Sequence, residues 1–281
     1  MIYSVSEQAS GAGGRTLGKV ATALTIAGSD SGGGAGIQAD LKTFHQLGVY
    51  GMSAITAVTA QNTLGVAGVY PLSVEAVSMQ IREVLRDIGA DAAKTGMLFD
   101  AAIISAVAEE VKAYGIQKLV VDPVMVAKGG AKLLLDEAIV ALQKHLLPVS
   151  EVVTPNLPEA ECLTGMQIRT PEDMREGARA IHALGVRNVL MKGGHLEGDI
   201  VVDMLFDGQA FYEISHERIQ TRHTHGTGCT FSAALTAELA KGTPLVTAVE
   251  KANRFIFEAI KTAPQLGGGH GPTNHWAVID E

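Results

Sequence analysis

The chain contains only two cysteines in 281 residues, Cys162 and Cys229, which give neither a disulfide framework nor the spacing of a zinc site. Basic residues are also few. The formal net charge is −8, and affinity for nucleic-acid backbones comes from clustered Lys and Arg, so no nucleic-acid partner is expected. No apolar run reaches the roughly 18 residues that a membrane-spanning helix needs. These absences favour a cytoplasmic protein without a membrane partner, which can still bind small anions locally.

The first 20 residues lack both an apolar signal core and an Arg-rich amphipathic face, and they are rich in Ser and Gly. We expect residues 1–20 to form a flexible leader that contributes little to the fold. The remaining residues, 21–281, show no linker and no internal repeat. With 47% hydrophobic residues the chain can bury a large core, so one domain is expected from residue 21 to the end.

Short β-branched runs alternate with longer segments of helical periodicity along the chain. This alternation predicts an α/β fold with a mostly parallel sheet covered by helices on both faces. Ligands of such sheets collect at the carboxyl ends of the strands. The expected strands are 23–27, 53–59, 92–95, 118–122, 152–154, 188–192 and 201–206, and the expected helices include 73–88, 100–114 and 171–184.

A glycine-rich segment follows the first expected strand, with Gly28, Gly32, Gly33, Gly34 and Gly36 inside nine residues. Part of it fits the G-x-G-x-x-A spacing of a dinucleotide site. That interpretation also needs an acidic residue about 20 positions further on, and residues 41–74 contain none. The P-loop pattern G-x-x-x-x-G-K-[ST] is absent from the chain, so these glycines must accommodate another kind of ligand.

A second glycine motif, Gly226-Thr227-Gly228-Cys229, leads into an apolar helical stripe. Free backbone N–H groups and the positive end of the helix dipole make such a turn an anion site. The same position lowers the pKa of a thiol, so Cys229 is expected to reach the thiolate form near neutral pH. An isolated G-T-G-C is otherwise a glycine turn with a small buried thiol. The local pattern leaves both interpretations open.

Seven motifs, in order, resemble those of the hydroxymethylpyrimidine/phosphomethylpyrimidine kinases, thiamine-pathway members of the ribokinase-like superfamily. They are "AGSDSGGGAGIQADLKTF", "TAVTAQNT", "KTGML", "VDPVM", "TPNLPEAE", "MKGGH" and "GTGC", and the resemblance as a whole runs from about Thr22 to Trp276. The resemblance implies a ribokinase-like three-layer sandwich with a central, mainly parallel sheet. It also implies successive phosphorylation, by ATP, of 4-amino-5-hydroxymethyl-2-methylpyrimidine to its monophosphate and diphosphate, and a homodimer.

In that family role, the amides of Gly226, Thr227, Gly228 and Cys229 stabilise charge on the transferred phosphoryl group, and Cys229 accepts the substrate hydroxyl proton. His225 orients the loop. Lys192 and Asp122 are expected at the ATP phosphates. Asn156 and Glu159 are expected to bind Mg²⁺, directly or through water, since this ion keeps several waters. The alternative for these two residues is a helix cap and a first-turn acid. A dependence on K⁺ stays open.

The resemblance places the first glycine segment at the pocket for the flat substrate ring. Gln61 is the expected specificity residue, because its amide offers a donor and an acceptor to an aminopyrimidine. Gly28 and Ala35 match pocket positions, Asp40 is a polar neighbour that can instead orient the loop, and Met97 and Val124 match apolar walls that are otherwise ordinary core. Cys162 is expected to pack within a helix.

Two other functions compete with this one. A pyridoxal kinase of the same superfamily would phosphorylate a related hydroxymethyl ring, and Gln61 favours the pyrimidine over it. A non-catalytic vitamin-binding protein on the same fold is the other alternative. The joint presence of Cys229, Lys192, Asp122 and Glu159 argues against it.

Overall fold

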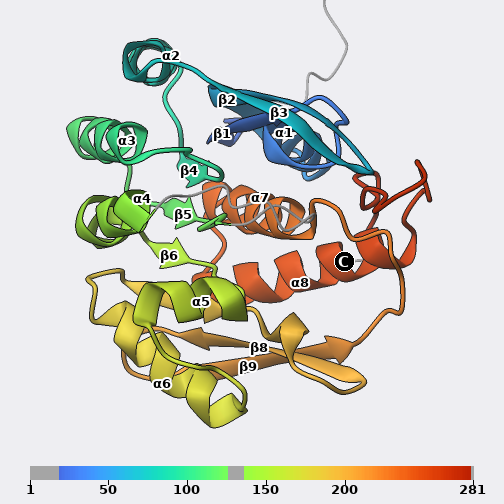
Figure 1. Cartoon of the computed structure of the whole chain (residues 1–281). Helices are drawn as coiled ribbons and strands as arrows, with labels where there is room; N and C mark the ends of the chain where they lie inside the picture. Colours follow the sequence, from blue (N-terminus) through green and yellow to red (C-terminus); the bar gives the residue numbers. More distant parts are fainter. Residues whose placement is uncertain (1–18, 126–135, 280–281) are drawn as a thin grey trace, which may run out of the picture.

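The computed structural model describes residues 19–125 and 136–279, so the expected leader lies almost entirely outside the described residues. The strands of the described part form a single sheet in the order β3-β2-β1-β4-β5-β6-β7-β8-β9 (Figure 1). Their bounds are β1 Thr22–Asp30, β2 Tyr50–Asn62, β3 Gly65–Pro71, β4 Ala92–Thr95, β5 Leu119–Val121, β6 Val152–Val153, β7 Asn188–Met191, β8 Ile200–Phe206 and β9 Phe211–Glu217.

Neighbouring strands from β2 to β7 run parallel, whereas β3, β8 and β9 are added antiparallel at the two edges. The prediction of a mainly parallel sheet is confirmed. The strand order reverses at β1, which lies between β2 and β4. Such a reversal point is where ligands bind in open α/β sheets, and the first glycine-rich segment begins there.

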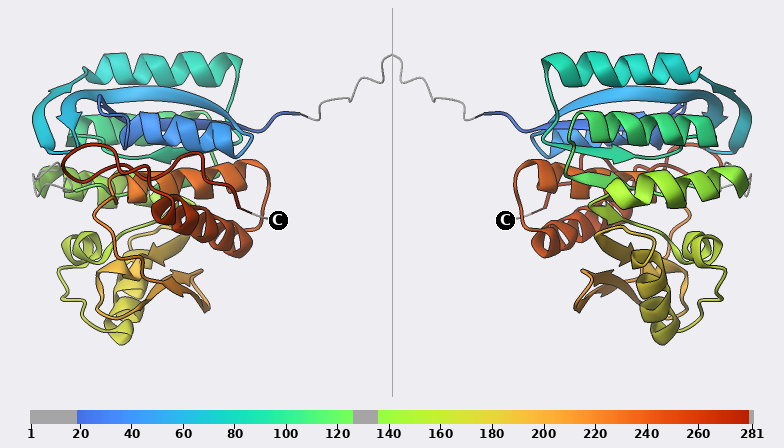
Figure 2. Two further views of the ribbon diagram at one scale, coloured as in Figure 1. Left: turned by 90° about the vertical axis from the view of Figure 1, so that its right-hand side faces the viewer. Right: turned by 90° about the vertical axis from the view of Figure 1, so that its left-hand side faces the viewer.

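Helices cover both faces of the sheet. One core cluster joins the sheet to α2–α6, and a second joins it to α1, α7 and α8. Figure 2 shows α1, α7 and α8 facing the viewer on one side, and α2, α3 and α4 on the other. The predicted three-layer sandwich is therefore confirmed. The helix bounds are α1 Gly36–Gln46, α2 Val74–Asp87, α3 Ala101–Ala113, α4 Asp136–Ala141, α5 Leu157–Thr164, α6 Pro171–His182, α7 Thr227–Ala240 and α8 Leu245–Lys261, with short turns at Leu142–Leu146, Leu147–Val149 and Gly193–His195.

The expected helix starts are set by local capping. Ser73, Asp100 and Thr170 each accept a backbone N–H of the first turn, so α2, α3 and α6 begin where the sequence predicts. Helix α7 differs from the expected one-sided stripe, because every residue from Thr230 to Ala240 is buried. It is a central helix enclosed by the sheet, α1 and α8. No described helix combines the length and apolar character required to cross a membrane.

The two glycine motifs touch each other. Gly226 has φ +78°, and a Cβ atom there would lie 1.8 Å from the carbonyl oxygen of Gly34. Gly36 has φ +57°, and its Cβ would lie 2.2 Å from the carbonyl oxygen of Gly28. Only glycine fits these positions. The close approach brings the N-termini of α1 and α7 to the same edge of the sheet.

Candidate active site

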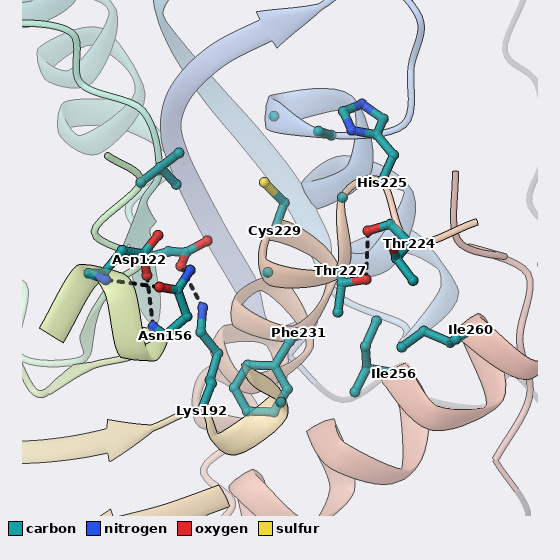
Figure 3. Close-up of a pocket in the computed structure, with 18 of the residues that line it drawn as sticks. Asp122, Asn156, Lys192, Thr224, His225, Thr227, Cys229, Phe231, Ile256 and Ile260 are labelled. Carbon is teal, nitrogen blue, oxygen red and sulfur yellow. Dashed lines mark hydrogen bonds and ion pairs between the residues drawn. The ribbon is translucent and has the colours of Figure 1, made fainter. Parts of the chain in front are cut away.

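A cavity of about 730 Å³ lies at the carboxyl edge of the parallel strands, between the two glycine motifs. Figure 3 shows part of its wall, with Asp122 just after β5, Asn156 just before α5, and residues of α7 and α8. The cavity brings together most of the residues singled out in the sequence. They are Gly28, Ala35, Gln61, Met97, Asp122, Val124, Asn156, Glu159, Lys192, Gly226, Thr227, Gly228 and Cys229.

The start of α7 is built as an anion site. Gly226 is its N-cap, and the side chain of Thr227 donates to the carbonyl of Thr224 at 2.8 Å, which fixes the entry of the loop. The first turn of a helix leaves its N–H groups without intrahelical acceptors, and they point along the positive end of the dipole. In α7 the Thr227 N–H already donates to the Thr224 carbonyl at 3.3 Å, whereas Gly228 and Cys229 line the cavity, where their N–H groups can bind a phosphoryl group.

Lys192 follows β7 and points at the same place. Its Nζ atom lies 3.1 Å from Asp122 Oδ1, at the end of β5, and 17% of its side chain is exposed. A Cβ atom on Gly228 would lie within 3.5 Å of both the Lys192 amine and the Asp122 carboxylate. Burial alone would lower the pKa of Lys192, but Asp122 and Glu159 raise it above its usual value. A cation is therefore held beside the helix terminus.

Asn156 and Glu159 form a reciprocal capping box at the start of α5. Asn156 Oδ1 accepts from the Glu159 amide at 2.9 Å, and Glu159 Oε2 accepts from the Asn156 amide at 2.8 Å. The structural role that the sequence left open is thus present, and both residues also line the cavity. Burial, joined by the nearby Asp122, raises the pKa of Glu159 to about 7 although Lys192 opposes this.

The expectation that Cys229 is a thiolate near neutral pH is wrong. Burial raises the pKa of this thiol to about 12, and the cation of Lys94 only partly opposes the effect. The helix N-terminus suggested the opposite direction, because the sequence does not show how far the sulfur lies from water. Cys229 is a neutral thiol at neutral pH. Cys162 also differs from expectation: it lies in α5 but is exposed.

Asp40 does not line the cavity, so the prediction that it binds substrate is wrong. It is fully buried, and its carboxylate accepts from Thr25 Oγ1 at 2.6 Å and pairs with Lys94 Nζ at 2.8 Å. Lys94 is likewise fully buried and was missed in the sequence, although it opens the "KTGML" motif. Burial alone would lower the pKa of Lys94, but Asp40, Cys229 and Asp122 raise it. The two charges of this ion pair act on Cys229 in opposite directions, since Lys94 lowers the pKa of the thiol and Asp40 raises it.

The first glycine-rich loop holds a carboxylate of its own chain. Asp30 Oδ1 accepts from the amide of Gly32 at 2.8 Å, and Oδ2 accepts from the amides of Gly34 and Ala35 at 3.0 and 2.9 Å. The amides that a dinucleotide site would direct at pyrophosphate are therefore occupied by Asp30, a residue that the sequence analysis did not single out. The sulfur-bearing end of Met97 packs over Gly28, since a Cβ there would lie 2.5 Å from Met97 Cε.

Together, the sheet, the free helix terminus and the adjacent lysine define a phosphotransferase that works without a P-loop. A family model described as phosphomethylpyrimidine kinase matches residues 30–274. The chain belongs to the phosphomethylpyrimidine kinase family.

Relatives and solved structures agree with this assignment. The hydroxymethylpyrimidine/phosphomethylpyrimidine kinase of Bacillus subtilis is 56% identical over 256 residues, covering 91% of this chain and 94% of the relative. An ADP complex of Bacillus subtilis pyridoxal kinase superposes with a TM-score of 0.87 at 45% identity, covering 92% of this chain and 98% of the other. The structure of phosphomethylpyrimidine kinase from Clostridium difficile superposes with a TM-score of 0.77 at 46% identity. The match covers 86% of this chain and 100% of the other.

Proposed function

We propose that this chain phosphorylates 4-amino-5-hydroxymethyl-2-methylpyrimidine with ATP, first to the monophosphate and then to the diphosphate, as a step of thiamine biosynthesis. The observation that carries the proposal is the joint cavity, in which the helix terminus of α7 and Lys192 face the pocket that contains Gln61. Membership of the phosphomethylpyrimidine kinase family supports the substrate, and relatives that carry both kinase activities in their names support the two steps.

The amides at the start of α7 stabilise the negative charge that develops on the transferred phosphoryl group, and Lys192 binds the phosphates of ATP beside them. Asp122 holds Lys192 in place. The transition state of phosphoryl transfer is largely dissociative, so the attacking hydroxyl needs little help from a base before transfer. Cys229 contacts that hydroxyl and orients it as a neutral thiol. Cys229→Ala should lower turnover while sparing ATP binding, and near-normal turnover would contradict this role.

Mg²⁺ is the metal that we propose, with Asn156, Glu159 and Asp122 as the oxygen donors on its side of the cavity. Within residues 19–125 and 136–279, no group of three His, Cys, Asp or Glu side chains is placed to hold a metal ion. Such a donor set fits Mg²⁺ that is bound mainly by phosphates and waters, as this ion commonly is in kinases. When bound, Mg²⁺ neutralises charge on the phosphates.

A requirement for K⁺ is a separate question, decided by assays in potassium and sodium buffers.

Pyridoxal phosphorylation is the second candidate, because solved pyridoxal kinases share this fold and one from Staphylococcus aureus was obtained with AMP-PCP and pyridoxal. Gln61 favours the pyrimidine, since its amide matches the ring nitrogen and exocyclic amine of that substrate. The deciding experiment supplies ATP, Mg²⁺ and either ring compound and separates the products by charge. Pyrimidine mono- and diphosphate are expected, and pyridoxal phosphate alone would refute the pyrimidine assignment.

We further propose that residues 21–281 form a single domain and that the protein is cytoplasmic.

We also propose a homodimer formed through the β2–β3 hairpin. Val58, Leu64 and Tyr70 of this hairpin are between 44% and 77% exposed, and β3 is an edge strand. A second copy that packs on this hairpin would cover apolar side chains that are otherwise in water. Sedimentation equilibrium should show a dimer that Tyr70→Lys weakens, whereas a monomeric native chain would refute the proposal.

A further inference from the structure

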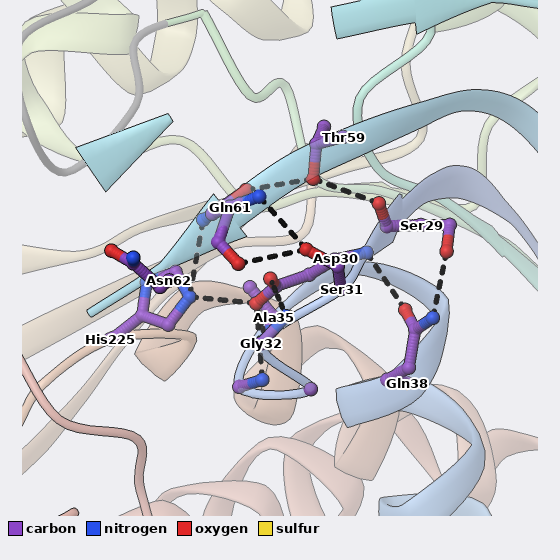
Figure 4. Close-up of polar contacts among 12 residues, drawn as sticks. Ser29, Asp30, Ser31, Gly32, Ala35, Gln38, Thr59, Gln61, Asn62 and His225 are labelled. Atoms are coloured by element: carbon purple, nitrogen blue, oxygen red, sulfur yellow. Dashed lines mark hydrogen bonds and ion pairs between the residues drawn. The ribbon is translucent and has the colours of Figure 1, made fainter. Parts of the chain in front are cut away.

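A continuous hydrogen-bond network joins the first glycine-rich loop, β2 and the residue before the Gly226–Cys229 loop (Figure 4). At its centre, His225 Nε2 lies 2.9 Å from Asp30 Oδ2. The same ring nitrogen lies 3.3 Å from one end of the Gln61 amide. The other end of that amide lies 3.1 Å from Thr59 Oγ1. The side chains of Asp30 and His225 are only 3% and 13% exposed, so water does not readily replace these contacts.

Asp30 is a carboxylate in this network. Its Oδ2 atom already accepts from two backbone N–H groups, which only donate, and so it does not carry a hydrogen itself. Burial alone would raise the pKa of Asp30, but hydrogen bonds from His225, Gly32 and Ala35 hold it below its ordinary value. Because a carboxylate oxygen can only accept, the His225 Nε2 atom that faces it carries the hydrogen and donates it.

The two ends of the Gln61 amide have nearly the same shape, and hydrogen bonding decides which is oxygen. A protonated His225 Nε2 has no lone pair, so an amide nitrogen beside it would set two donors against each other. At the other end, Thr59 Oγ1 directs its one hydrogen to the carbonyl of Ser29 at 2.9 Å. It therefore faces Gln61 as an acceptor. Both requirements are met when the amide oxygen faces His225 and the NH₂ group faces Thr59.

We propose that His225, held by Asp30, is a positioning residue that fixes the amide oxygen of Gln61 on its own side and thereby sets which way the substrate ring lies. The inference rests on the proposed pyrimidine substrate. The exocyclic amine is then recognised at the His225 end of the amide, and the ring nitrogen at the Thr59 end. The hydroxymethyl group is attached to the carbon next to the one that carries the amine. It therefore lies toward His225, which is followed directly by Gly226 and the phosphoryl-binding loop.

The same arrangement distinguishes pyridoxal from the aminopyrimidine by the group next to the reacting hydroxymethyl carbon. In pyridoxal, the carbon next to the reacting hydroxymethyl group carries an aldehyde, which can only accept a hydrogen bond. An aldehyde opposite the fixed amide oxygen places two acceptors together, and such a mismatch in a buried site weakens binding. His225 is thus a specificity-determining residue without being a catalytic one.

The experiment compares binding of the substrate with binding of its 4-oxo analogue, in which the amine becomes a carbonyl and the adjacent ring nitrogen gains a hydrogen. Calorimetry should show that the native protein prefers the amine by about 100-fold, since both contacts to Gln61 are mismatched in the analogue. In His225→Phe the ring is kept but the donor is lost, so the amide can turn and the preference should fall below about 10-fold. The matched variant Thr59→Val keeps His225 and should retain the native preference.

The opposite pattern, in which Thr59→Val loses the preference and His225→Phe keeps it, would overturn the proposal. A second measurement uses the native protein alone and requires neither a ligand nor a variant. Nitrogen-15 NMR of the histidine side chains in the native protein should show a protonated Nε2 on His225, and an unprotonated Nε2 would also overturn the proposal. If neither pyrimidine binds the native protein, the proposed substrate is wrong, and the NMR result still decides the orientation of the amide.

Discussion

Glu159 is a buried carboxyl group whose ionisation should be visible in the stability of the whole protein. Its pKa rises from 4.5 to about 7 because burial and the neighbouring Asp122 disfavour the charged form. The folded chain therefore binds more protons than the unfolded chain between these pH values. The stability contributed by the protonated group is fully present below pH 4.5 and is lost as the pH rises through about 7. A shift of this size corresponds to at most about 3 kcal/mol.

The variant Glu159→Gln isolates this effect, because glutamine also completes a capping box and cannot ionise. Urea unfolding at pH 8 should show the variant more stable than the native protein by up to about 3 kcal/mol. At pH 4, below both pKa values, the two proteins should nearly coincide. Glu75→Gln, at an exposed first-turn position of α2, is the matched control and should show no such pH dependence. Parallel stabilities of Glu159→Gln and the native protein at both pH values would refute the reasoning.

Three further predictions concern charge in and below the cavity. In a Cys162→Ser background, alkylation of Cys229 by iodoacetamide should stay slow from pH 6 to pH 9, because a pKa of about 12 keeps the sulfur as a thiol. A rate that rises with a midpoint near pH 7 would show that Cys229 is a thiolate at neutral pH. Lys192→Met should lower kcat/KM for ATP by roughly 100-fold or more in protein that is still folded by circular dichroism, and near-native kinetics would contradict a role for Lys192 at the ATP phosphates. Lys94→Met should lower the free energy of unfolding by about 3–5 kcal/mol, because it leaves Asp40 as an unpaired buried charge. Adding Asp40→Asn should recover part of the lost stability. Unchanged stability of Lys94→Met in chemical denaturation would contradict this prediction.

Local signals were sufficient for much of the fold. The starts of α2, α3 and α6 were predictable because their caps, Ser73, Asp100 and Thr170, each depend on a side chain and an amide only a few residues away. Strands β4, β5, β6 and β7 were visible as short runs that are buried throughout, as expected for strands covered on both faces. Strands β3 and β9 were missed. The first contains two glycines and ends in proline, and the second has exposed polar residues, so both resemble connecting segments.

The motifs located the site, but the state of its charged groups depends on residues far away in the sequence. The pKa of Cys229 follows its burial in the first turn of α7 and the charges of Asp40 and Lys94, which pair across 54 positions of the chain. The contact between Asp30 and His225 spans 195 positions. No periodicity or spacing in the sequence reports such contacts, which the packing of α1 and α7 creates. Motif matching therefore identified the lining residues and misjudged Asp40 and the protonation of Cys229.

The most direct test of the account is the ratio of kcat/KM for 4-amino-5-hydroxymethyl-2-methylpyrimidine to kcat/KM for pyridoxal, measured with ATP and Mg²⁺ on the same preparation. The ratio reports transition-state discrimination in the pocket that contains Gln61. We predict a ratio well above one, with pyrimidine monophosphate converted further to the diphosphate. A ratio below one would keep the kinase fold and the phosphoryl-binding loop but contradict the assignment of the substrate.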